Sequence, residues 1–510
     1  MATNYSCEQN YEKVVSDNLG TLPNEVILNI FTHLTIKDLG RCAQVSKNFG
    51  AIAYVKSLWT KVLVTGGTVS NKLLEQALSR GLKYLGLSRR SFFSTLEPNY
   101  PPTNQIEYLA LRIPLTSPVD EKYFRQLLLS CHNLKKLSVT DGDWKSDELT
   151  KGILQNSNSL KVLDLSGCCK LNPQDLKSIV SRCLELTEAN FDYLCLHTYN
   201  LASIFTNLTP NIKKLSLSGA ALRLRDLSKL ITRCKEITDL DLTWAILFPE
   251  ETITNIKFPR EIKLESLYLR GFDRLFHIRF SYLEMFIQSC EKSLQVLDIS
   301  SCKKMNFEAI QLIVSRCLNL TEVDFRELKH TSFICKNLTS NIVKVSLSST
   351  DVSNEDIKTL VSRCNKIQEL DISNTYVAID AVVDEIILHL SSTLEKFTLT
   401  MCSSEFSLFK LCSMPKLKNL WITPEYVNGI DIYKSEMERM ISDSDKWKKQ
   451  FPSVVISCVS LHELGIITPN IAKPMLMEEK IWEIKCEGIQ LYDQEEEVLE
   501  VDCPLDYSVP

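Results

Sequence analysis

The stretch LKVLDLSGCCKLNPQDLKSIVSRCLELTE, residues 160–188, decides the fold. It opens with alternating apolar residues, as in Leu163-Asp164-Leu165, which indicates a short strand with every second side chain buried. From Pro173 onward the apolar spacing becomes helical, which predicts a helix with one buried stripe. The residues of that stripe are Leu176, Ile179, Val180 and Cys183. The stretch therefore predicts a strand, a turn, a helix and the start of a new strand.

The same unit recurs along the chain. The pattern L-x-x-L-x-L, with Ile, Val, Ala or aromatic replacements, begins fourteen times at intervals of 22 to 30 residues, which is typical of leucine-rich repeats. One unit has too little apolar surface to fold alone, so its neighbours must complete its core. We predict an α/β fold, a curved solenoid of about fourteen repeats with parallel strands on the concave face and helices outside. The repeats start at Leu82, Ile106, Leu134, Leu160, Leu186, Ile212, Ile237, Leu264, Leu294, Leu320, Ile342, Ile367, Leu394 and Leu417.

Part of the repeat array is duplicated. Residues 294–322, LQVLDISSCKKMNFEAIQLIVSRCLNLTE, match residues 160–188 at 17 of 29 positions. The next two strand starts of each copy also correspond, with the offset falling from 134 to 130 residues. We infer that a block of four repeats was copied, which lengthened the solenoid.

Cysteines recur at one position of the repeat, and their role could be chemical or structural. They lie on predicted core stripes, where a small buried side chain is the ordinary interpretation, whereas a nucleophile needs a base and an electropositive setting. The seven histidines are scattered and form no H-E-x-x-H or zinc-finger spacing. We therefore expect core packing, no metal, no cofactor and no catalytic residue. The recurring cysteines are Cys131, Cys183, Cys234, Cys317 and Cys364, with a second set at Cys168, Cys302 and Cys402.

Composition limits the partners and the compartment. The 510 residues are 44% hydrophobic and 24% charged, with a formal net charge of −5, and the sequence shows no concentrated basic face. We therefore expect no binding to nucleic acid or to an anionic membrane. The N-terminus lacks the pattern of a signal peptide, and no stretch has the roughly 20 apolar residues of a membrane span. The expected location is the nucleus and cytoplasm.

A short module precedes the repeats at residues 22–62, LPNEVILNIFTHLTIKDLGRCAQVSKNFGAIAYVKSLWTKV. Pro23 suits a first helical turn, and Ile27, Ile30, Phe31 and Leu34 make one apolar stripe. About 40 residues with this much apolar surface barely sustain a core, so part of the surface should face a partner or the repeats. The residues alone leave two roles open, an end cap of the solenoid or a docking module.

This module resembles an F-box, with the Leu-Pro opening and the late tryptophan in place. The resemblance implies docking on the Skp adaptor of cullin-RING ubiquitin ligases and, through it, on the cullin and RING subunits, which supply the chemistry. The residues that it nominates for adaptor binding are Leu22, Pro23, Glu25, Ile30, Leu34, Leu39, Val45, Phe49 and Trp59.

The C-terminal end sharpens the resemblance. FPSVVISC at 451–458, ITPNIAKP at 467–474 and KIWEIKC at 480–486 are similar, in the same order, to the end of S-phase kinase-associated F-box proteins. In that family the tail runs back along the concave face, and a small cyclin-kinase accessory subunit helps to capture a phosphorylated client. Two charged family positions fall here on Asn374 and Met401, and the N-terminal arm is short. The client should therefore not be copied across.

The predicted organisation follows from these segments. We expect a short N-terminal arm at 1–21, an F-box at 22–62, a linker and first repeat at 63–105 and leucine-rich repeats at 106–423. A C-terminal cap and tail at 424–486 should fold back over the concave face, and 487–510 should be an acidic mobile tail.

The third, fifth and seventh residues of each repeat should face the concave side. They include many carboxylates and fewer cations, which leaves two interpretations. The fifth-position aspartates suit the strand and are solvated, or they form a largely acidic groove for a basic peptide, with lysines and arginines available for a phosphate or acidic side chain. The candidate client-binding residues are Asp239, Asp241, Arg270, Glu322, Asp324, Arg326, Lys344, Glu369, Asp371, Asn374, Met401 and Trp421.

These features predict a non-catalytic substrate receptor of an SCF-type E3 ubiquitin ligase, which captures a protein client for ubiquitination and degradation. The alternative is a leucine-rich-repeat binding or inhibitor protein whose F-box serves only as an end cap. Binding to the Skp adaptor separates the two.

Overall fold

The computed structural model describes two compact units, one that includes Met1–Leu134 and one of Lys135–Ile489. The described residues are 22–34, 36–64, 67–69, 77–87, 91–93, 102–112, 118–140, 146–168, 170–194, 204, 206–248, 258–259, 261–272, 280–400, 405–423, 425–427, 430–432 and 455–458. Among them, no helix is both long enough and apolar enough to cross a membrane.

The first unit begins with a helical module. It consists of α1 (Asn24–Phe31), α2 (Ile36–Ala43), α3 (Lys47–Ala53) and the 3-10 helix η1 (Lys56–Trp59). The apolar spacing of the three α-helices closes a small core, in which Phe31 meets Phe49 edge to face at 5.5 Å. The core residues are Ile27, Phe31, Leu39, Phe49, Ile52 and Ala53.

Parallel strands follow the helical module directly. Strand β1 (Lys61–Val64) pairs with β3 (Tyr84–Leu87), which pairs with β5 (Tyr108–Arg112). A second parallel pair joins β2 (Gly67–Val69) to β4 (Ser91–Phe93), and α5 (Pro118–Ser130) ends the unit's regular structure. The repeat pattern of strand and helix is thus already present in the first unit.

The second unit is built on one parallel sheet, whose strands pair in the order in which they occur along the chain; β10, β12, β20 and β21 lie outside it. Smaller pairs are β10 (Ala221–Arg223) with β12 (Ile246–Phe248), and β20 (Glu425–Val427) with β21 (Ile430–Ile432). The main strands are β6 (Lys136–Thr140), β7 (Val162–Asp164), β8 (Glu188–Asn190), β9 (Lys214–Ser216), β11 (Asp239–Asp241), β13 (Ser266–Tyr268), β14 (Val296–Asp298), β15 (Glu322–Asp324), β16 (Lys344–Ser346), β17 (Glu369–Asp371), β18 (Lys396–Thr400), β19 (Asn419–Thr423) and β22 (Val455–Cys458).

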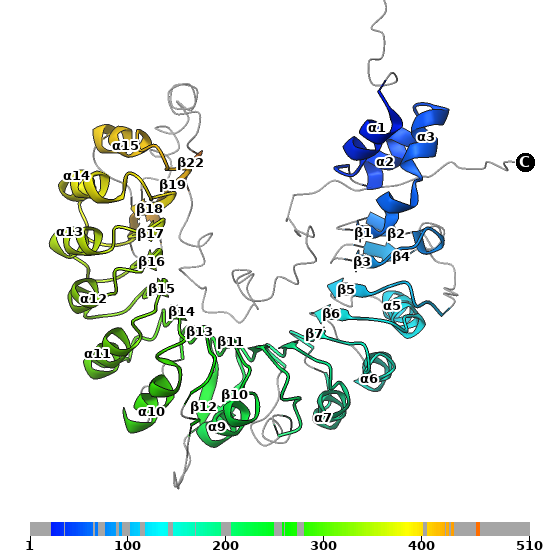
Figure 1. Ribbon diagram of the computed structural model, residues 1–510, viewed down its shortest axis with the longest axis horizontal. Helices are drawn as coiled ribbons and strands as arrows, with labels where there is room; N and C mark the ends of the chain where they lie inside the picture. The colour runs from blue at the N-terminus through cyan, green and yellow to red at the C-terminus, as the bar shows by residue number, and fades with distance from the viewer. Residues whose placement is uncertain are drawn as a thin grey trace, which may run out of the picture. The chain divides into compact units, whose positions relative to one another are not determined.

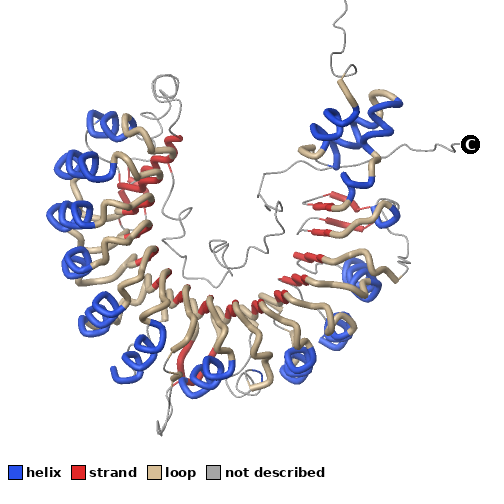
Figure 2. Tube along the Cα trace, viewed as in Figure 1, coloured by secondary structure: helices blue, strands red, loops and turns tan. Residues whose placement is uncertain are grey.

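Helices cover one side of this sheet, as Figures 1 and 2 show for the second unit. We call the other side the strand face; it carries the third, fifth and seventh residues of each repeat. The helices are α6 (Ser146–Leu154), α7 (Pro173–Arg182), α9 (Leu224–Arg233), α10 (Phe280–Cys290), α11 (Phe307–Arg316), α12 (Thr331–Asn337), α13 (Asn354–Arg363), α14 (Ile379–Leu390) and α15 (Glu405–Cys412).

The predicted α/β repeat fold is confirmed. Each of the fourteen predicted repeats contains a strand that begins two residues after the first apolar residue of its motif. In the repeat that starts at Leu160, the motif residues Leu160, Leu163 and Leu165 are all fully buried. Helix α7 begins at Pro173 as predicted, and the Asn172 side chain caps it by accepting a hydrogen bond from Gln174 N. Strand β22 extends the sheet beyond residue 423, within the segment predicted as a C-terminal cap and tail.

The recurring cysteines pack in the core, as predicted. Cys183, Cys234, Cys317 and Cys364 are the C-cap residues of their helices and are buried. The Cys364 thiol donates to the Thr339 carbonyl oxygen of the preceding repeat at 3.3 Å. Burial raises the pKa of Cys183 to about 11 and of Cys317 to about 12, so these thiols stay protonated near neutral pH. Cys402 lies outside the described residues.

Candidate functional site

The helical module divides the predicted adaptor-binding residues by exposure. Pro23, Glu25, Ile30 and Val45 are exposed, with Ile30 at 39% and Val45 at 63%. Leu22 and Leu34 are partly buried and pack against the core, whereas Leu39, Phe49 and Trp59 are buried. Adaptor contact stays a prediction for all nine. The structure brings four of them to the surface and uses the buried ones to hold the module together.

Trp59 shows why a late tryptophan is needed here. Its indole Nε1 donates to the Ala53 carbonyl oxygen at 2.9 Å, and its ring stacks on Tyr54 with centroids 6.1 Å apart. The Arg80 guanidinium lies 4.8 Å from the Trp59 ring and 4.6 Å from the Tyr54 ring. Trp59 therefore links α3 to the start of the repeats and is only 4% exposed.

A groove lies on the strand face across β13 to β19. Tyr268 lies on its first strand and Trp421 on its last, and third- and fifth-position side chains line it between them. Asp239 and Asp241 lie on β11 and are not among its lining residues. The charged lining residues are Asp298, Glu322, Asp324, Arg326, Lys344, Glu369, Asp371 and Lys396.

Exposed acidic and basic side chains alternate across this groove, at the third residue of successive repeats. Lys344 Nζ lies 3.3 Å from a Glu322 oxygen and 3.8 Å from a Glu369 oxygen, and Lys396 Nζ lies 3.1 Å from Glu369. All four side chains are between 34% and 42% exposed, so solvent screens these pairs. The groove is therefore mixed in charge, and the expectation of a largely acidic groove does not hold for this part of the strand face.

The fifth-position aspartates end their strands. In five repeats the carboxylate accepts a hydrogen bond from the N–H two residues later, an Asx turn that starts the bend after the strand. The N to O distances run from 2.7 Å at Asp241 to 3.1 Å at Asp324. This favours the interpretation that aspartate at this position suits the strand. The aspartates that make this bond are Asp164, Asp241, Asp298, Asp324 and Asp371.

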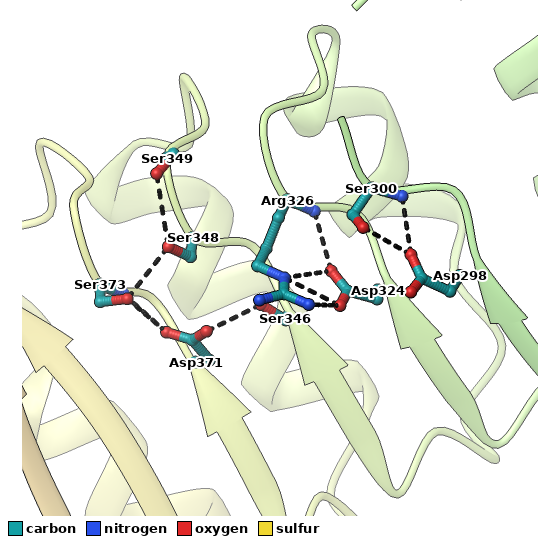
Figure 3. Close-up of polar contacts among 9 residues, drawn as sticks. All are labelled: Asp298, Ser300, Asp324, Arg326, Ser346, Ser348, Ser349, Asp371 and Ser373. Atoms are coloured by element: carbon teal, nitrogen blue, oxygen red, sulfur yellow. Dashed lines mark hydrogen bonds and ion pairs between the residues drawn. The ribbon is translucent and has the colours of Figure 1, made fainter. Parts of the chain in front are cut away.

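Arg326 is engaged internally (Figure 3). Its Nε lies 2.9 Å from both carboxylate oxygens of Asp324, and its Nη2 lies 2.5 Å from Oδ2. Only 6% of the side chain is exposed. Burial and the Asp324 carboxylate raise the pKa of Asp298, and the Arg326 guanidinium lowers it. The expectation that this arginine is available for a phosphate is therefore wrong, because its guanidinium already binds a carboxylate in a buried setting.

The other candidate residues are placed as follows. Asn374 lies in the turn after β17 with φ of 50°, and its Nδ2 donates to Ser349 Oγ at 2.9 Å. Arg270 is only 6% exposed, and Asp239 Oδ2 accepts from the Thr238 hydroxyl at 2.7 Å. Trp421 is half-buried on the groove's last strand, and Met401 lies outside the described residues.

Sequence reasoning missed three features of these surfaces. Val26, on α1, is 43% exposed beside the predicted adaptor-binding residues. Tyr268 occupies a fifth position and lines the groove, so the position rule applied to carboxylates would also have found it. Tyr193 and Trp244 occupy the eighth position of their repeats, for which the pattern made no prediction.

Both the helical module and part of the repeats match known protein families. Residues 19–65 match the F-box-like family, and residues 72–291 match the SKP2 LRR domain family. This chain is an F-box/leucine-rich-repeat protein. The family prediction from the Leu-Pro opening, the late tryptophan and the repeats is confirmed.

Other F-box/leucine-rich-repeat proteins are similar over part of their length. F-box/LRR-repeat protein 5 of Xenopus laevis is 26% identical over 203 residues, which cover 32% of this chain and 30% of that protein. F-box/LRR-repeat protein 21 of Mus musculus is 21% identical over 235 residues, which cover 42% of this chain and 54% of that protein. The chain thus matches about a third to a half of the length of these relatives.

Solved structures of repeat proteins are similar as well. One is the yeast complex of Rad7 and Elc1, with a TM-score of 0.45 and 15% identity, covering 78% of this F-box/leucine-rich-repeat chain and 92% of that chain. Another is an internalin, InlF, from Listeria monocytogenes, with a TM-score of 0.34 and 15% identity, covering 60% and 84%.

Proposed function

We propose that this protein is the substrate-recognition subunit of an SCF-type cullin-RING E3 ubiquitin ligase. The F-box-like module would dock on a Skp adaptor, and the repeats would hold a protein client for ubiquitination and degradation. The chain would contribute no chemical residue, because holding the client's lysines near a ubiquitin-charged enzyme is itself the catalytic contribution. The family match of residues 19–65 supports the adaptor, and the nucleus and cytoplasm are the proposed location.

One observation carries the proposal. The module exposes three branched apolar side chains, Val26 at 43%, Ile30 at 39% and Val45 at 63%, although its core is closed by other residues. Val26 and Ile30 are one helical turn apart on α1, and Val45 follows α2. Apolar surface of this kind beside a complete core is typical of a protein interface. The adaptor of the F-box family is the partner that would cover it.

The strand face of the second unit is the proposed client surface. Its groove combines alternating charges with an aromatic side chain on its first and last strands, which suits a polypeptide better than a small molecule. The proposal does not include the phosphorylated cell-cycle client or the cyclin-kinase accessory subunit of the S-phase kinase-associated proteins. Arg326 is buried against Asp324, and Asn374 carries no charge, so two features that would support that client are missing among the described residues.

Co-purification with a Skp adaptor tests the proposal. We expect the intact protein to bind the adaptor and the double variant Ile30→Asp/Val45→Asp to lose binding at least 100-fold, because it places two charges in the apolar interface. Leu184→Asp/Leu318→Asp is the matched control, since these leucines are 56% and 60% exposed on the repeats. Circular dichroism should show both variants folded.

The choice of variant follows from the packing. Leu22 and Leu34 touch the module's core, so truncating them would mix adaptor binding with folding. Failure of the intact protein to bind any Skp adaptor would overturn the proposal. The remaining function would then be that of a leucine-rich-repeat binding protein with an F-box-like end cap.

A further inference from the structure

Charged side chains at the third position of successive repeats form one straight row across the groove. In the register of the sheet, Lys344 lies opposite Glu322 on one side and opposite Glu369 on the other. Lys396 follows, opposite Glu369 on the next strand. We call these four residues of β15, β16, β17 and β18 the charge row. Because its members are register partners, the row runs across the strands and along the groove that they line.

The two ends of the charge row differ from its middle. Lys344 has two carboxylate partners, at 3.3 and 3.8 Å, and Glu369 has two lysine partners, at 3.8 and 3.1 Å. In the part of the chain that the structure describes, Glu322 and Lys396 have one ion-pair partner each. The row therefore has an acidic end and a basic end, each of which can take a second partner. The next third-position residues on either side are neutral: Val296 and Asn419.

The surroundings strengthen the difference between the two ends. At the acidic end of the groove, burial raises the pKa of Tyr268, and nearby carboxylates raise it further. These carboxylates belong to Asp239, Asp241, Glu322 and Asp298. At the basic end, the Lys418 ammonium, which donates to Glu395 at 2.6 Å, lowers the pKa of Glu395, and the charges of Lys416 and Lys396 lower it further. Negative charge thus gathers around Tyr268 and positive charge around Lys396.

The charge row is the part of the groove that is open to an external charge. Its side chains are between 34% and 42% exposed, and ion pairs at this exposure are weak because solvent screens them. An external charge can therefore join or replace such a pair at little cost. The fifth-position aspartates differ, since Asp298 and Asp371 already accept the N–H groups of their own turns.

The geometry of the sheet fixes the spacing of a matching ligand. Glu322 on β15 and Lys396 on β18 lie three strands apart in the sheet order. Neighbouring strands are about 4.8 Å apart, so these two residues are separated by roughly 14 Å along the row. An extended chain advances about 3.3 Å per residue and therefore covers roughly the same length in four residues. Residues four apart in an extended chain also point to the same side.

We propose that the groove binds an extended segment of a client protein that carries a basic and an acidic side chain four residues apart, the basic one against Glu322 and the acidic one against Lys396. Arginine suits the acidic end, because Tyr268 lines it and an aromatic ring favours a guanidinium beside a carboxylate. The residue midway between the two charges should be neutral, because Lys344 and Glu369 neutralise each other there. The inference deepens the proposed function and rests on it only for the source of the segment.

Peptide binding to the full chain tests the proposal. The probe is a fluorescein-labelled serine-threonine peptide with an arginine and a glutamate four residues apart. A leucine two residues beyond the glutamate can reach Trp421 on the strand next to Lys396. The comparison peptide has the same composition, but its two charges are three residues apart and lie on opposite sides of an extended chain. We expect the probe to bind at least about fivefold more tightly in anisotropy measurements at low salt, because only the probe brings both charges to the row.

Reversal of the basic end should change which ligand is preferred. Lys396→Glu gives the row an acidic group at both ends, so this variant should prefer a peptide with a second arginine in place of the glutamate by at least about fivefold. The intact protein should prefer the original probe. Lys229→Glu is the matched control, since this exposed lysine undergoes the same change of charge on α9, on the helix side of the sheet.

The acidic end is tested by a change that keeps the size of the side chain. Glu322→Gln should bind the probe and a peptide with neutral citrulline in place of the arginine equally, whereas the intact protein should prefer the arginine. Circular dichroism should show all three variants folded.

Two results would overturn the inference. One is equal or undetectable binding of the probe and the comparison peptide to the intact protein, and the other is an unchanged order of preference in Lys396→Glu or Glu322→Gln. Adaptor co-purification is measured on the same proteins. Failure to bind the adaptor with the peptide preferences retained contradicts only the proposed function, and the reverse pattern contradicts only this inference.

Discussion

At the scale of single residues, acidic side chains on the strand face have two different roles, although they look alike in the sequence. Asp371 accepts hydrogen bonds from Ser373 N at 3.0 Å, Ser373 Oγ at 2.7 Å and Ser346 Oγ at 2.8 Å, so it organises the turn after β17. Glu369, two residues earlier on the same strand, is 34% exposed, and among the described residues its ion-pair partners are lysines on the neighbouring strands. Charge alone therefore does not identify a binding residue on this face.

Substitution of these two acids should separate the roles. We expect Asp371→Ala to lower the free energy of unfolding by about 1–3 kcal/mol, because three donors, two of them on the buried Ser373, lose their acceptor. Glu369→Ala should change it by less than about 0.5 kcal/mol, because its ion pairs are screened. Urea unfolding followed by circular dichroism measures both. Equal costs would show that the turn does not depend on the aspartate.

The raised pKa of Asp192 makes a prediction about pH. Burial and the nearby Asp241 carboxylate raise the pKa of Asp192 above its unfolded value of about 3.9. Well below about pH 4 the carboxyl is protonated in both the folded and the unfolded state, so it does not change the free energy of unfolding. As the pH rises from there toward the higher folded pKa, ionisation favours the unfolded chain, so stability falls.

Asp192→Asn removes this titration and keeps an acceptor oxygen for Ser218 N. We expect the native protein to lose more unfolding free energy between pH 5 and pH 8 than this variant does. Glu185→Gln, at an exposed carboxylate, should leave the pH dependence of the native protein unchanged. Parallel slopes for native protein and Asp192→Asn would contradict the assignment.

At the scale of the repeat element, the turn after the strand has one recurring geometry. The eighth residue has positive φ in nine successive repeats, from Gly167 to Asn374, and only three of the nine are glycine. Serine, asparagine, glutamate, tyrosine and tryptophan also occupy the left-handed region there. This backbone conformation is unfavourable for residues other than glycine, so the stacking of the repeats must compensate its free-energy cost. A glycine is needed at Gly219 and Gly271 for another reason, because the ring from the preceding repeat fills the space of a side chain.

Gly271→Ala should therefore be costly. We expect a loss of about 2 kcal/mol or more, from the left-handed backbone and from overlap of the new Cβ with the Trp244 ring. In the double variant Trp244→Asn/Gly271→Ala the overlap is absent, so the cost of the alanine relative to Trp244→Asn should fall to about 1 kcal/mol. Thermal and urea unfolding of all four proteins measure the coupling. Additive costs would show that the ring and the glycine do not share this space.

At the scale of the whole molecule, each described strand of the main sheet in the second unit pairs with the strands next to it in the repeat order. The stability of such an array is approximately the sum of the stabilities of single repeats and of the interfaces between adjacent repeats. A destabilising substitution should therefore act mainly on its own repeat and the adjacent ones. We therefore expect that one part of the strand face can loosen while the rest stays folded.

Hydrogen exchange can test this locality. Leu297 on β14 is only 1% exposed, and Leu297→Ala should cost about 2–5 kcal/mol in its repeat. We expect amides of β13 and β15 to lose much more protection than those of β7, which lies five strands away from β14 in the sheet order. Mass spectrometry of digested fragments measures the protection. A uniform loss across the second unit would show that it unfolds as one cooperative body.

The sequence by itself determined the repeat fold, the burial of its cysteines and the family of the chain. These features depend on apolar periodicity and short motifs, which are local properties, and β7 and α7 formed where the pattern predicted them. Only the tertiary structure decided which polar side chains are available. Arg326, Trp59 and Asn374 were candidate binding residues in the sequence, just as Lys344, Ile30 and Val45 were. In the structure Arg326 binds Asp324 of its own repeat, Trp59 donates to Ala53 of α3, and Asn374 donates to Ser349 of the preceding repeat. The physical reason is that burial and pairing depend on how side chains pack in three dimensions, which apolar periodicity does not encode.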